Sequence, residues 1–253
     1  MFVLHRKGLK LDGSHPLLLS GYGGFNISMT PGFRELTAVW VERGGVYAEP
    51  NLRGGGEFGE VWHRAGMLAN KQNVFDDFIA AAQWLVKSGY TSPSRLAIYG
   101  GSNGGLLMGA ALTQRPDLFG AVVCRYPLLD MVRYHKFFIA RFWVSEYGSS
   151  EDTGQFKYLY AYSPYHRVKP GEKYPAVLFV TGDADTRVAP LHARKMAALV
   201  QASTGSDRPV LLKYEVKAGH SGGMPVTKRV DDLADELGFM LWQTGDGATR
   251  TAR

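Results

Sequence analysis

The stretch Gly100-Gly-Ser-Asn-Gly-Gly contains a serine in a G-x-S-x-G pattern, which suits a nucleophile. The apolar run 96–99 before it has the length of a buried parallel strand, and apolar residues after it recur at helical spacing. In a sharp strand-to-helix turn the serine hydroxyl projects clear of the backbone, and the glycines leave space that a Cβ would fill. We therefore predict that Ser102 is the nucleophile of an acyl transfer. The alternative is a flexible glycine-rich loop.

Candidates for the acid and the base follow two later apolar runs. Asp183 and Asp185 follow the run 176–181, and His220 follows the run 210–216 with glycines around it. An imidazole can take the serine proton and later protonate the leaving group, while a buried carboxylate orients the imidazole. Nucleophile, acid and histidine in this chain order are typical of α/β hydrolases. We predict His220 as the base, whereas spacing alone leaves Asp183 and Asp185 equally good as the acid.

The elements that would position these residues alternate between strand and helix. We expect strands at 2–6, 17–22, 45–51, 96–99, 121–125, 176–181 and 210–216, and helices at 33–42, 73–87, from the elbow to 115, 131–143, 190–201 and 225–242. Asn73 is expected to cap the second helix, which has the clearest apolar face. The alternation predicts an α/β-hydrolase fold, with a mainly parallel central sheet and helices on both faces. Ligands of such sheets bind at the carboxyl ends of the strands.

Length and composition favour one catalytic domain spanning 1–253. A chain of 253 residues with 45% hydrophobic residues can bury a core of that size. The region 131–175 is less regular, and its glycines and prolines predict either a lid or a surface insertion. The single cysteine, Cys124, lies in an apolar run and is expected to be buried packing, which favours a reducing compartment.

Several function classes are disfavoured by what the sequence lacks. The net charge is +6, but the basic residues are scattered, so we expect no nucleic-acid partner. No apolar run approaches the roughly 18 residues needed to cross a bilayer, and the N-terminus lacks the order of a signal peptide. We expect a soluble, cytoplasmic protein without a membrane partner. The sequence also lacks a nucleotide-binding glycine pattern, and we expect no cofactor and no metal.

Further stretches of the chain match a known family. They are Tyr22-Gly-Gly-Phe-Asn, Asn51-Leu-Arg-Gly-Gly-Gly-Glu-Phe-Gly, Asn70-Lys-Gln-Asn with Phe75-Asp-Asp-Phe, Arg115-Pro-Asp-Leu-Phe-Gly, Asp185-Thr-Arg-Val-Ala-Pro-Leu-His and Ala218-Gly-His. Together with the elbow, these stretches resemble the catalytic domain of the prolyl oligopeptidase family. They cover nearly all of the chain and are more specific than the elbow alone.

The resemblance implies roles for particular residues. The family's catalytic aspartate stands two residues before a substrate-binding arginine, which favours Asp185 with Arg187 and leaves Asp183 as structural. It also implies an oxyanion hole formed by the backbone N–H of Asn103 and the hydroxyl of Tyr22. The implied substrate-binding residues are Phe25, Trp143, Tyr147, Arg187 and Val188, with Trp143 stacking on proline. Without the family, the aromatic pair Trp143 and Tyr147 is more typical of a core.

The chain departs from the family pattern at its N-terminus. Family members carry a large N-terminal β-propeller that restricts access to short peptides. From this sequence, which begins near the second strand of the hydrolase domain, we expect no propeller. An open active face favours an esterase or acyl hydrolase acting on small esters through an acyl-enzyme. The alternative is a post-proline oligopeptidase that cleaves short peptides. A non-catalytic binding protein is a remote alternative, because all three triad residues are present.

The same departure bears on assembly. The predicted strand 2–6 would lack the partner that precedes it in the family, and the surface otherwise covered by the propeller would be bare. Unpaired strand edges and large apolar patches favour association. We therefore predict a two-fold homodimer. The alternative is a monomer in which the basic residues of this strand protect the edge.

Overall fold

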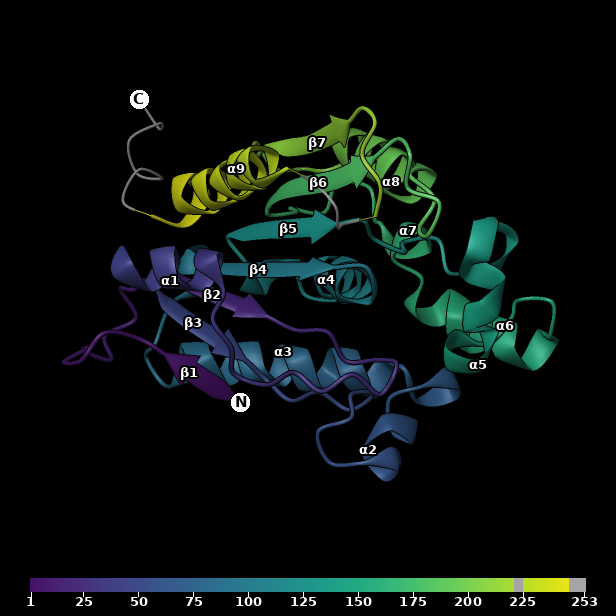
Figure 1. The fold of residues 1–253 in the computed structure, drawn as a ribbon, viewed down its shortest axis with the longest axis horizontal. Helices are drawn as coiled ribbons and strands as arrows, with labels where there is room; N and C mark the ends of the chain where they lie inside the picture. The colour runs from purple at the N-terminus through teal and green to yellow at the C-terminus, as the bar shows by residue number, and fades with distance from the viewer. Residues whose placement is uncertain (221–224, 246–253) are drawn as a thin grey trace.

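The computed structural model describes residues 1–220 and 225–245, and seven of its segments are strands of one sheet. The strands are β1 (Phe2–Leu4), β2 (Leu17–Ser20), β3 (Val46–Glu49), β4 (Leu96–Gly101), β5 (Ala121–Arg125), β6 (Ala176–Gly182) and β7 (Val210–Glu215). Their order is β1-β3-β2-β4-β5-β6-β7, and only β1 runs antiparallel to its neighbour. The prediction of a mainly parallel sheet is confirmed (Figure 1).

Helices connect the strands. The α-helices are α1 (Glu35–Glu42), α2 (Glu60–Arg64), α3 (Gln72–Lys87), α4 (Asn103–Gln114), α5 (Val144–Tyr147), α6 (Thr153–Tyr162), α7 (Pro164–Arg167), α8 (Leu191–Ser203) and α9 (Val226–Thr244). Short 3₁₀ helices are η1 (Leu68–Asn70), η2 (Pro93–Arg95), η3 (Pro116–Leu118), η4 (Tyr134–Lys136) and η5 (Phe138–Trp143). Within residues 1–220 and 225–245, no helix is both long enough and apolar enough to cross a membrane.

The two faces of the sheet carry separate apolar cores. In β5, Val122 and Cys124 pack with residues of α3, α4 and α8, while Ala121 and Val123 pack with α1 and α9. This division follows from the strand itself, because successive side chains point to opposite faces. Cys124 is fully buried, as predicted. Helices therefore cover both faces, which confirms the α/β-hydrolase architecture.

The segment 131–143 differs most from its prediction. In place of one α-helix it forms η4 and η5, and Phe138, the first residue of η5, has a φ of 46° in the left-handed region. A bulky residue rarely adopts this conformation, and it interrupts an α-helix. The helical spacing of the aromatic residues is misleading, because Tyr134 is fully buried while Phe138 and Phe142 are exposed.

Smaller differences concern the glycine-rich segment before α3. The sequence analysis did not predict α2 and η1. The predicted cap of α3 is wrong, because the helix begins at Gln72 and Asn73 lies inside it. The Asn73 amide instead donates to the carbonyl oxygen of Ala65 at 2.8 Å. It therefore ties α3 to the end of α2.

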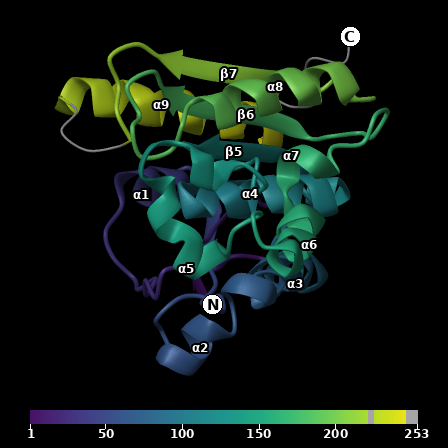
Figure 2. The ribbon, with the colours of Figure 1, turned by 90° about the vertical axis from the view of Figure 1, so that its right-hand side faces the viewer.

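The segment that contains α5, α6 and α7 lies beyond the carboxyl ends of the central strands (Figure 1). Viewed from that end, these helices lie in front of the sheet (Figure 2). Of the three, α7 packs against α4, while α5 and α6 contact η1. The segment therefore stands where ligands of parallel sheets bind. Whether it acts as a lid stays a prediction.

Candidate active site

Ser102 lies in the turn between β4 and α4. Its φ of 58° and ψ of −118° depart from the usual regions for a side-chain-bearing residue, and its backbone N–H donates to Arg125 O at 2.9 Å. The neighbouring glycines allow this turn. A Cβ on Gly100 would lie 2.5 Å from the carbonyl oxygen of Gly104, and one on Gly105 would lie 2.8 Å from that of Arg125. The hydroxyl is thereby held at the carboxyl edge of the sheet.

His220 connects Ser102 to Asp185. The His220 Nε2 atom lies 3.1 Å from Ser102 Oγ, and its Nδ1 atom lies 2.8 Å from Asp185 Oδ2. Asp185 is buried, and its Oδ1 atom accepts the backbone N–H groups of Arg187 at 2.9 Å and Val188 at 2.8 Å. One carboxylate oxygen is thus fixed by the backbone while the other faces the ring. This arrangement allows His220 to take the hydroxyl proton through Nε2.

The structure separates the two candidate acids. Asp183 is exposed, and its Oδ1 atom accepts the backbone N–H of Lys217 at 2.6 Å. Asp183 therefore joins the end of β6 to the turn that leads to His220, and among residues 1–220 and 225–245 it forms no hydrogen bond or ion pair with the His220 ring. The structure places Asp185 against His220. The glycines predicted to clear space after His220 lie outside the described residues.

Two donors face the position where negative charge would develop. The Tyr22 hydroxyl is hydrogen-bonded to Ser102, and burial raises the pKa of Tyr22 while Arg187 opposes the rise, so the phenol stays protonated at neutral pH. Asn103 is the first residue of α4, and its backbone N–H has no acceptor within the helix. The N-terminal end of a helix also favours negative charge. Both predicted oxyanion donors therefore lie beside Ser102.

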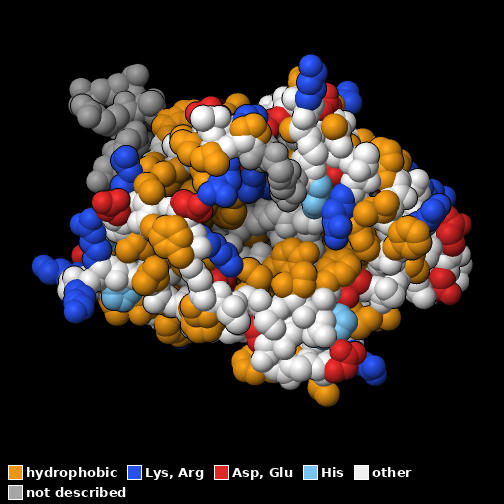
Figure 3. Space-filling view, viewed as in Figure 1, with side chains coloured by type: hydrophobic (Ala, Val, Ile, Leu, Met, Phe, Trp, Pro, Cys, Tyr) orange, Lys and Arg blue, Asp and Glu red, His pale blue; other side chains and the backbone are white. Residues whose placement is uncertain are grey.

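A cavity of about 220 Å³ opens beside Ser102. The predicted residues Phe25, Trp143 and Tyr147 line it with aromatic rings. The centroid of the Phe25 ring lies 6.3 Å from that of Trp143 and 5.4 Å from that of Tyr147, and both pairs are edge to face. The Arg187 guanidinium lies 5.7 Å from the Trp143 ring centroid. Figure 3 shows hydrophobic side chains gathered beyond the carboxyl ends of the central strands. The cavity is small, and half of its lining residues are aromatic, which suits one compact side chain.

Val188 is placed differently from the other predicted pocket residues. It is buried and does not line this cavity, and its backbone N–H holds Asp185 instead. The cavity includes further residues that the sequence analysis did not single out: Ile27, Leu128, Phe142 and Ser145. Phe142 and Ser145 lie beside Trp143 in the sequence and Ile27 lies two residues after Phe25, but the sequence carries no other signal for these residues. Among the described residues, no group of three or more His, Cys, Asp or Glu side chains is arranged to hold a metal ion.

Comparisons with known proteins agree with this geometry. A profile described as "Prolyl oligopeptidase family" matches residues 31–247. The chain is 48% identical over 246 residues to "Prolyl endopeptidase" of Elizabethkingia miricola and 42% identical over 248 residues to "Prolyl oligopeptidase A" of Amanita bisporigera. These alignments cover 97% of the chain but only 35% and 33% of the two relatives. The chain thus spans about a third of the length of the curated relatives it matches.

Solved structures show the same similarity. One, from a study of two prolyl endopeptidases and their inter-domain dynamics, superposes with a TM-score of 0.94 at 57% identity over 96% of this chain and 36% of its own. A post-proline cleaving enzyme from Rickettsia typhi superposes with a TM-score of 0.90 at 37% identity, again over 96% of this chain and 35% of its own. In both, the similar part is a catalytic-domain-sized third of a longer protein.

Proposed function

Because the chain belongs to the prolyl oligopeptidase family of serine hydrolases, we propose that it carries the chemistry of a post-proline peptidase. The substrate is a short peptide, and the bond cleaved follows a proline. The relatives named above are prolyl peptidases by name, which supports the peptidase over the ester hydrolase that the sequence analysis placed first. The non-catalytic alternative has no support.

The proposed mechanism uses the residues that the structure brings together. Ser102 Oγ attacks the carbonyl carbon while His220 Nε2 takes the hydroxyl proton, and Asp185 holds the ring in the required tautomer. The tetrahedral oxyanion accepts hydrogen bonds from the Tyr22 hydroxyl and the Asn103 backbone N–H. His220 then protonates the leaving amine, which leaves an acyl group on Ser102. Water, deprotonated by His220, then attacks the acyl carbon, the acyl–Oγ bond breaks, and His220 returns the proton to Ser102 Oγ as the acid product leaves.

The observation that carries the peptidase proposal is the aromatic cavity beside the serine. Its volume of about 220 Å³ suits a pyrrolidine ring, and a flat aromatic ring such as Trp143 can stack on that ring. Arg187 is exposed at the rim and can donate a charge-assisted hydrogen bond to a substrate carbonyl. A simple ester would need neither contact. The same acyl-enzyme chemistry would still hydrolyse an activated ester as a side reaction.

A substrate comparison tests this proposal. We expect the chain to release p-nitroaniline from a Gly-Pro anilide and to lose most of that activity when Trp143→Ala or Arg187→Ala is introduced, while hydrolysis of p-nitrophenyl acetate changes only a few-fold. Ser102→Ala serves as the blank for both substrates. Activity on the ester alone would favour the esterase. Equal losses on both substrates would show that Trp143 and Arg187 support the site without selecting proline.

Two further expectations remain predictions: the cytoplasmic location and the homodimer. The edge strand β1 exposes 42% of Phe2 and 51% of Leu4, which is compatible with association through this edge. Light scattering behind a sizing column distinguishes the alternatives. A mass near 27.9 kDa at micromolar concentration would rule out the dimer.

A further inference from the structure

The loop that follows β2 carries two residues of the proposed site, Tyr22 and Phe25, but its own sequence gives it little stiffness. It reads Gly21-Tyr-Gly-Gly-Phe, and Gly23, Phe25 and Asn26 all have positive φ angles, of 63°, 59° and 55°. Such backbone is strained for the two non-glycine residues and persists only when the surroundings hold it. The surroundings of this loop therefore decide where the Tyr22 hydroxyl lies.

Three side chains from different elements hold the backbone of this loop. Asn103 Nδ2 donates to Tyr22 O at 2.6 Å, Lys71 Nζ donates to Gly23 O at 2.9 Å, and Glu146 Oε1 accepts the Phe25 N–H at 3.0 Å. They come from α4, the start of α3 and α5, respectively. Three backbone polar groups within this short loop are thus hydrogen-bonded to side chains that lie far apart in the sequence.

Two of these partners are charged and enclosed. Lys71 is 1% exposed and Glu146 is 4% exposed, and Lys71 Nζ lies 3.7 Å from Glu146 Oε1. Burial lowers the pKa of Lys71 to about 8 against the attraction of Glu146. The second carboxylate oxygen of Glu146 lies 2.8 Å from His63 Nε2 on α2. Burying such a pair costs desolvation energy that apolar residues would avoid, so its presence here calls for a role other than stability.

The pair also joins the loop to the wall of the cavity. Glu146 and Tyr147 are neighbours on α5, and Lys71 Nζ lies 5.3 Å from the centroid of the Tyr147 ring. The Tyr147 hydroxyl donates to Asn103 Oδ1 at 2.8 Å, and Asn103 in turn holds Tyr22. The loop with its oxyanion donor and the aromatic wall are therefore two sides of one buried polar network.

We propose that Lys71 and Glu146 are positioning residues that hold the Tyr22 hydroxyl at the oxyanion and fix it relative to the aromatic wall of the cavity. This inference rests on the proposed acyl transfer at Ser102 and adds two residues that touch neither the substrate nor the reacting atoms. It predicts that loss of either charge weakens the transition-state contact made by Tyr22. Binding of the ground-state substrate should change much less, because the cavity rings remain.

The test uses Lys71→Met and Glu146→Gln, each alone and combined with Tyr22→Phe. Both substitutions keep the approximate shape, and Glu146→Gln keeps an acceptor for the Phe25 N–H. The matched control is Lys213→Met, which removes another lysine paired with buried carboxylates, Glu215 and Asp232, on β7 and α9. kcat and KM are measured on the Gly-Pro anilide, or on p-nitrophenyl acetate if only the ester is turned over. Thermal unfolding of every variant reports its fold.

We expect each single variant to lose on the order of 10- to 100-fold in kcat, with KM within about 3-fold. This loss is smaller than the roughly 10²- to 10³-fold cost of removing an oxyanion donor outright, because the Tyr22 hydroxyl is displaced and not removed. In the Tyr22→Phe background the same substitutions should cost less than about 3-fold more, because they act through Tyr22. Lys213→Met should keep the wild-type kcat even if its melting temperature falls.

Two results would overturn the inference: a wild-type kcat in folded Lys71→Met and Glu146→Gln, or losses that multiply in full with Tyr22→Phe. If Lys71→Met does not fold, Glu146→Gln alone decides by the same criteria. Failure of the proposed acyl transfer at Ser102 has a different signature, since Ser102→Ala would then still turn over the substrate, and failure of the peptidase proposal would show as activity on the ester alone. An inactive Ser102→Ala with fully active Lys71 and Glu146 variants contradicts only the positioning role.

Discussion

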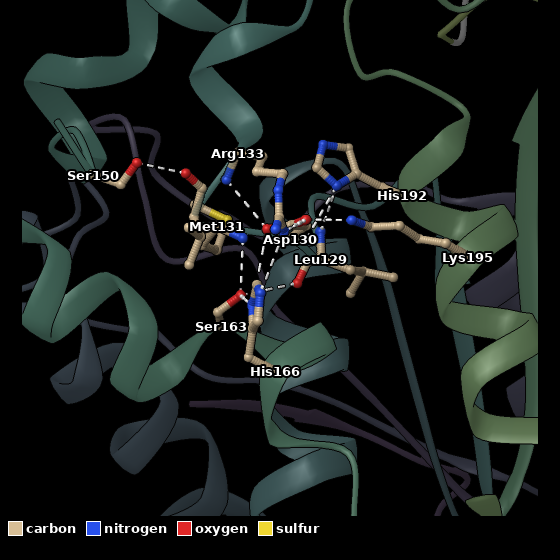
Figure 4. Close-up of polar contacts among 10 residues, drawn as sticks. Leu129, Asp130, Met131, Arg133, Ser150, Ser163, His166, His192 and Lys195 are labelled. Carbon is tan, nitrogen blue, oxygen red and sulfur yellow. Dashed lines mark hydrogen bonds and ion pairs between the residues drawn. The ribbon is translucent and has the colours of Figure 1, made fainter.

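Within residues 1–220 and 225–245, a serine, a histidine and a buried aspartate lie together in two clusters. One is Ser102, His220 and Asp185, at the ends of β4, β7 and β6. The other is Ser163, His166 and Asp130, where Ser163 Oγ lies 2.8 Å and Asp130 Oδ1 lies 3.9 Å from the histidine. Figure 4 shows the second cluster between α7 and α8. By residue type and rough distance the two are alike.

The two clusters differ in which nitrogen of the histidine ring contacts the serine and which contacts the aspartate. His220 contacts the aspartate through Nδ1 and the serine through Nε2, so a proton taken at one side is balanced by charge at the other. In the second cluster Ser163 and Asp130 both face Nδ1 of His166. The Ser163 hydroxyl also donates to Leu129 O at 3.4 Å and accepts the N–H of Met131 at 2.9 Å. The Ser163 hydroxyl therefore holds the backbone at Leu129 and Met131 in place, which is a structural role.

They differ in access and charge as well. Ser163 is fully buried, whereas Ser102 lines an open cavity. Burial would raise the pKa of Asp130, but hydrogen bonds from Lys195 and Arg133 outweigh burial, and the pKa is lowered. Cations thus already match much of the negative charge of Asp130. The pKa of His166 is lowered by burial, and the attraction of Asp130 only partly opposes this shift, so the neutral ring is favoured. The two clusters contain the same residue types. What distinguishes the catalytic cluster from the structural one is which atoms are hydrogen-bonded to each other and whether the serine is accessible.

Replacement of the two serines should separate the clusters by the largest margin. We expect Ser102→Ala to lower kcat by about 10⁴- to 10⁶-fold while unfolding as the wild type does. Ser163→Ala should keep kcat within a few-fold and lower the free energy of unfolding by about 1–3 kcal/mol, because the Met131 N–H loses a buried acceptor. Steady-state kinetics and urea denaturation measure both. Loss of catalysis in folded Ser163→Ala would remove the distinction.

Replacing the aspartates should likewise lower kcat only in the cluster that contains Ser102. Asp185→Asn should cost about 10⁴-fold in kcat, since the amide holds the wrong tautomer of His220. Asp130→Asn and Asp183→Asn should act mainly on stability, because neither carboxylate bonds the ring of His220. The comparison is made on kcat of protein shown to be folded by circular dichroism. A larger kcat loss for Asp183→Asn than for Asp185→Asn would assign the acid to Asp183.

A smaller effect is expected from His192, which borders the second cluster. Its Nδ1 atom accepts the N–H of Asp130 at 3.1 Å, and burial lowers its pKa to about 4 from an ordinary value of 6.5. Because the unfolded chain binds a proton that the folded chain excludes, stability is full above pH 6.5 and falls toward pH 4, by about 3 kcal/mol. His192→Asn keeps an acceptor without titrating. If the free energy of unfolding fell equally toward low pH in the wild type and in His192→Asn, His192 would not be the cause.

Local patterns in the sequence were sufficient to predict the sheet and most of its helices. Strands such as 121–125 are short apolar runs, and the elbow combines a strand, glycines and a helix within a few residues. The segment 131–143 was predicted wrongly because the left-handed turn at Phe138 has no signature in residue type. Asp183 and Asp185 could not be ranked from spacing, since the choice depends on which carboxylate faces His220.

The network behind the oxyanion loop was not predictable for a different reason. Lys71 and Glu146 are far apart in the sequence, and only the packing of α3 and α5 against the loop brings them within 3.7 Å. Neither residue belongs to a sequence motif whose spacing indicates a catalytic role. Lys71 does lie in the stretch Asn70-Lys-Gln-Asn that supported the family resemblance, but the stretch itself gives no partner for the charge.

Covalent labelling tests most directly whether Ser102, and not Ser163, is the activated serine of the two clusters. The protein is treated with a fluorophosphonate, and the modified residue is located by peptide mass mapping. We predict one label per chain, on Ser102, which is abolished by Ser102→Ala or His220→Ala and unchanged by Ser163→Ala. A label on Ser163 or any other residue, or undiminished labelling of Ser102→Ala, would contradict the account.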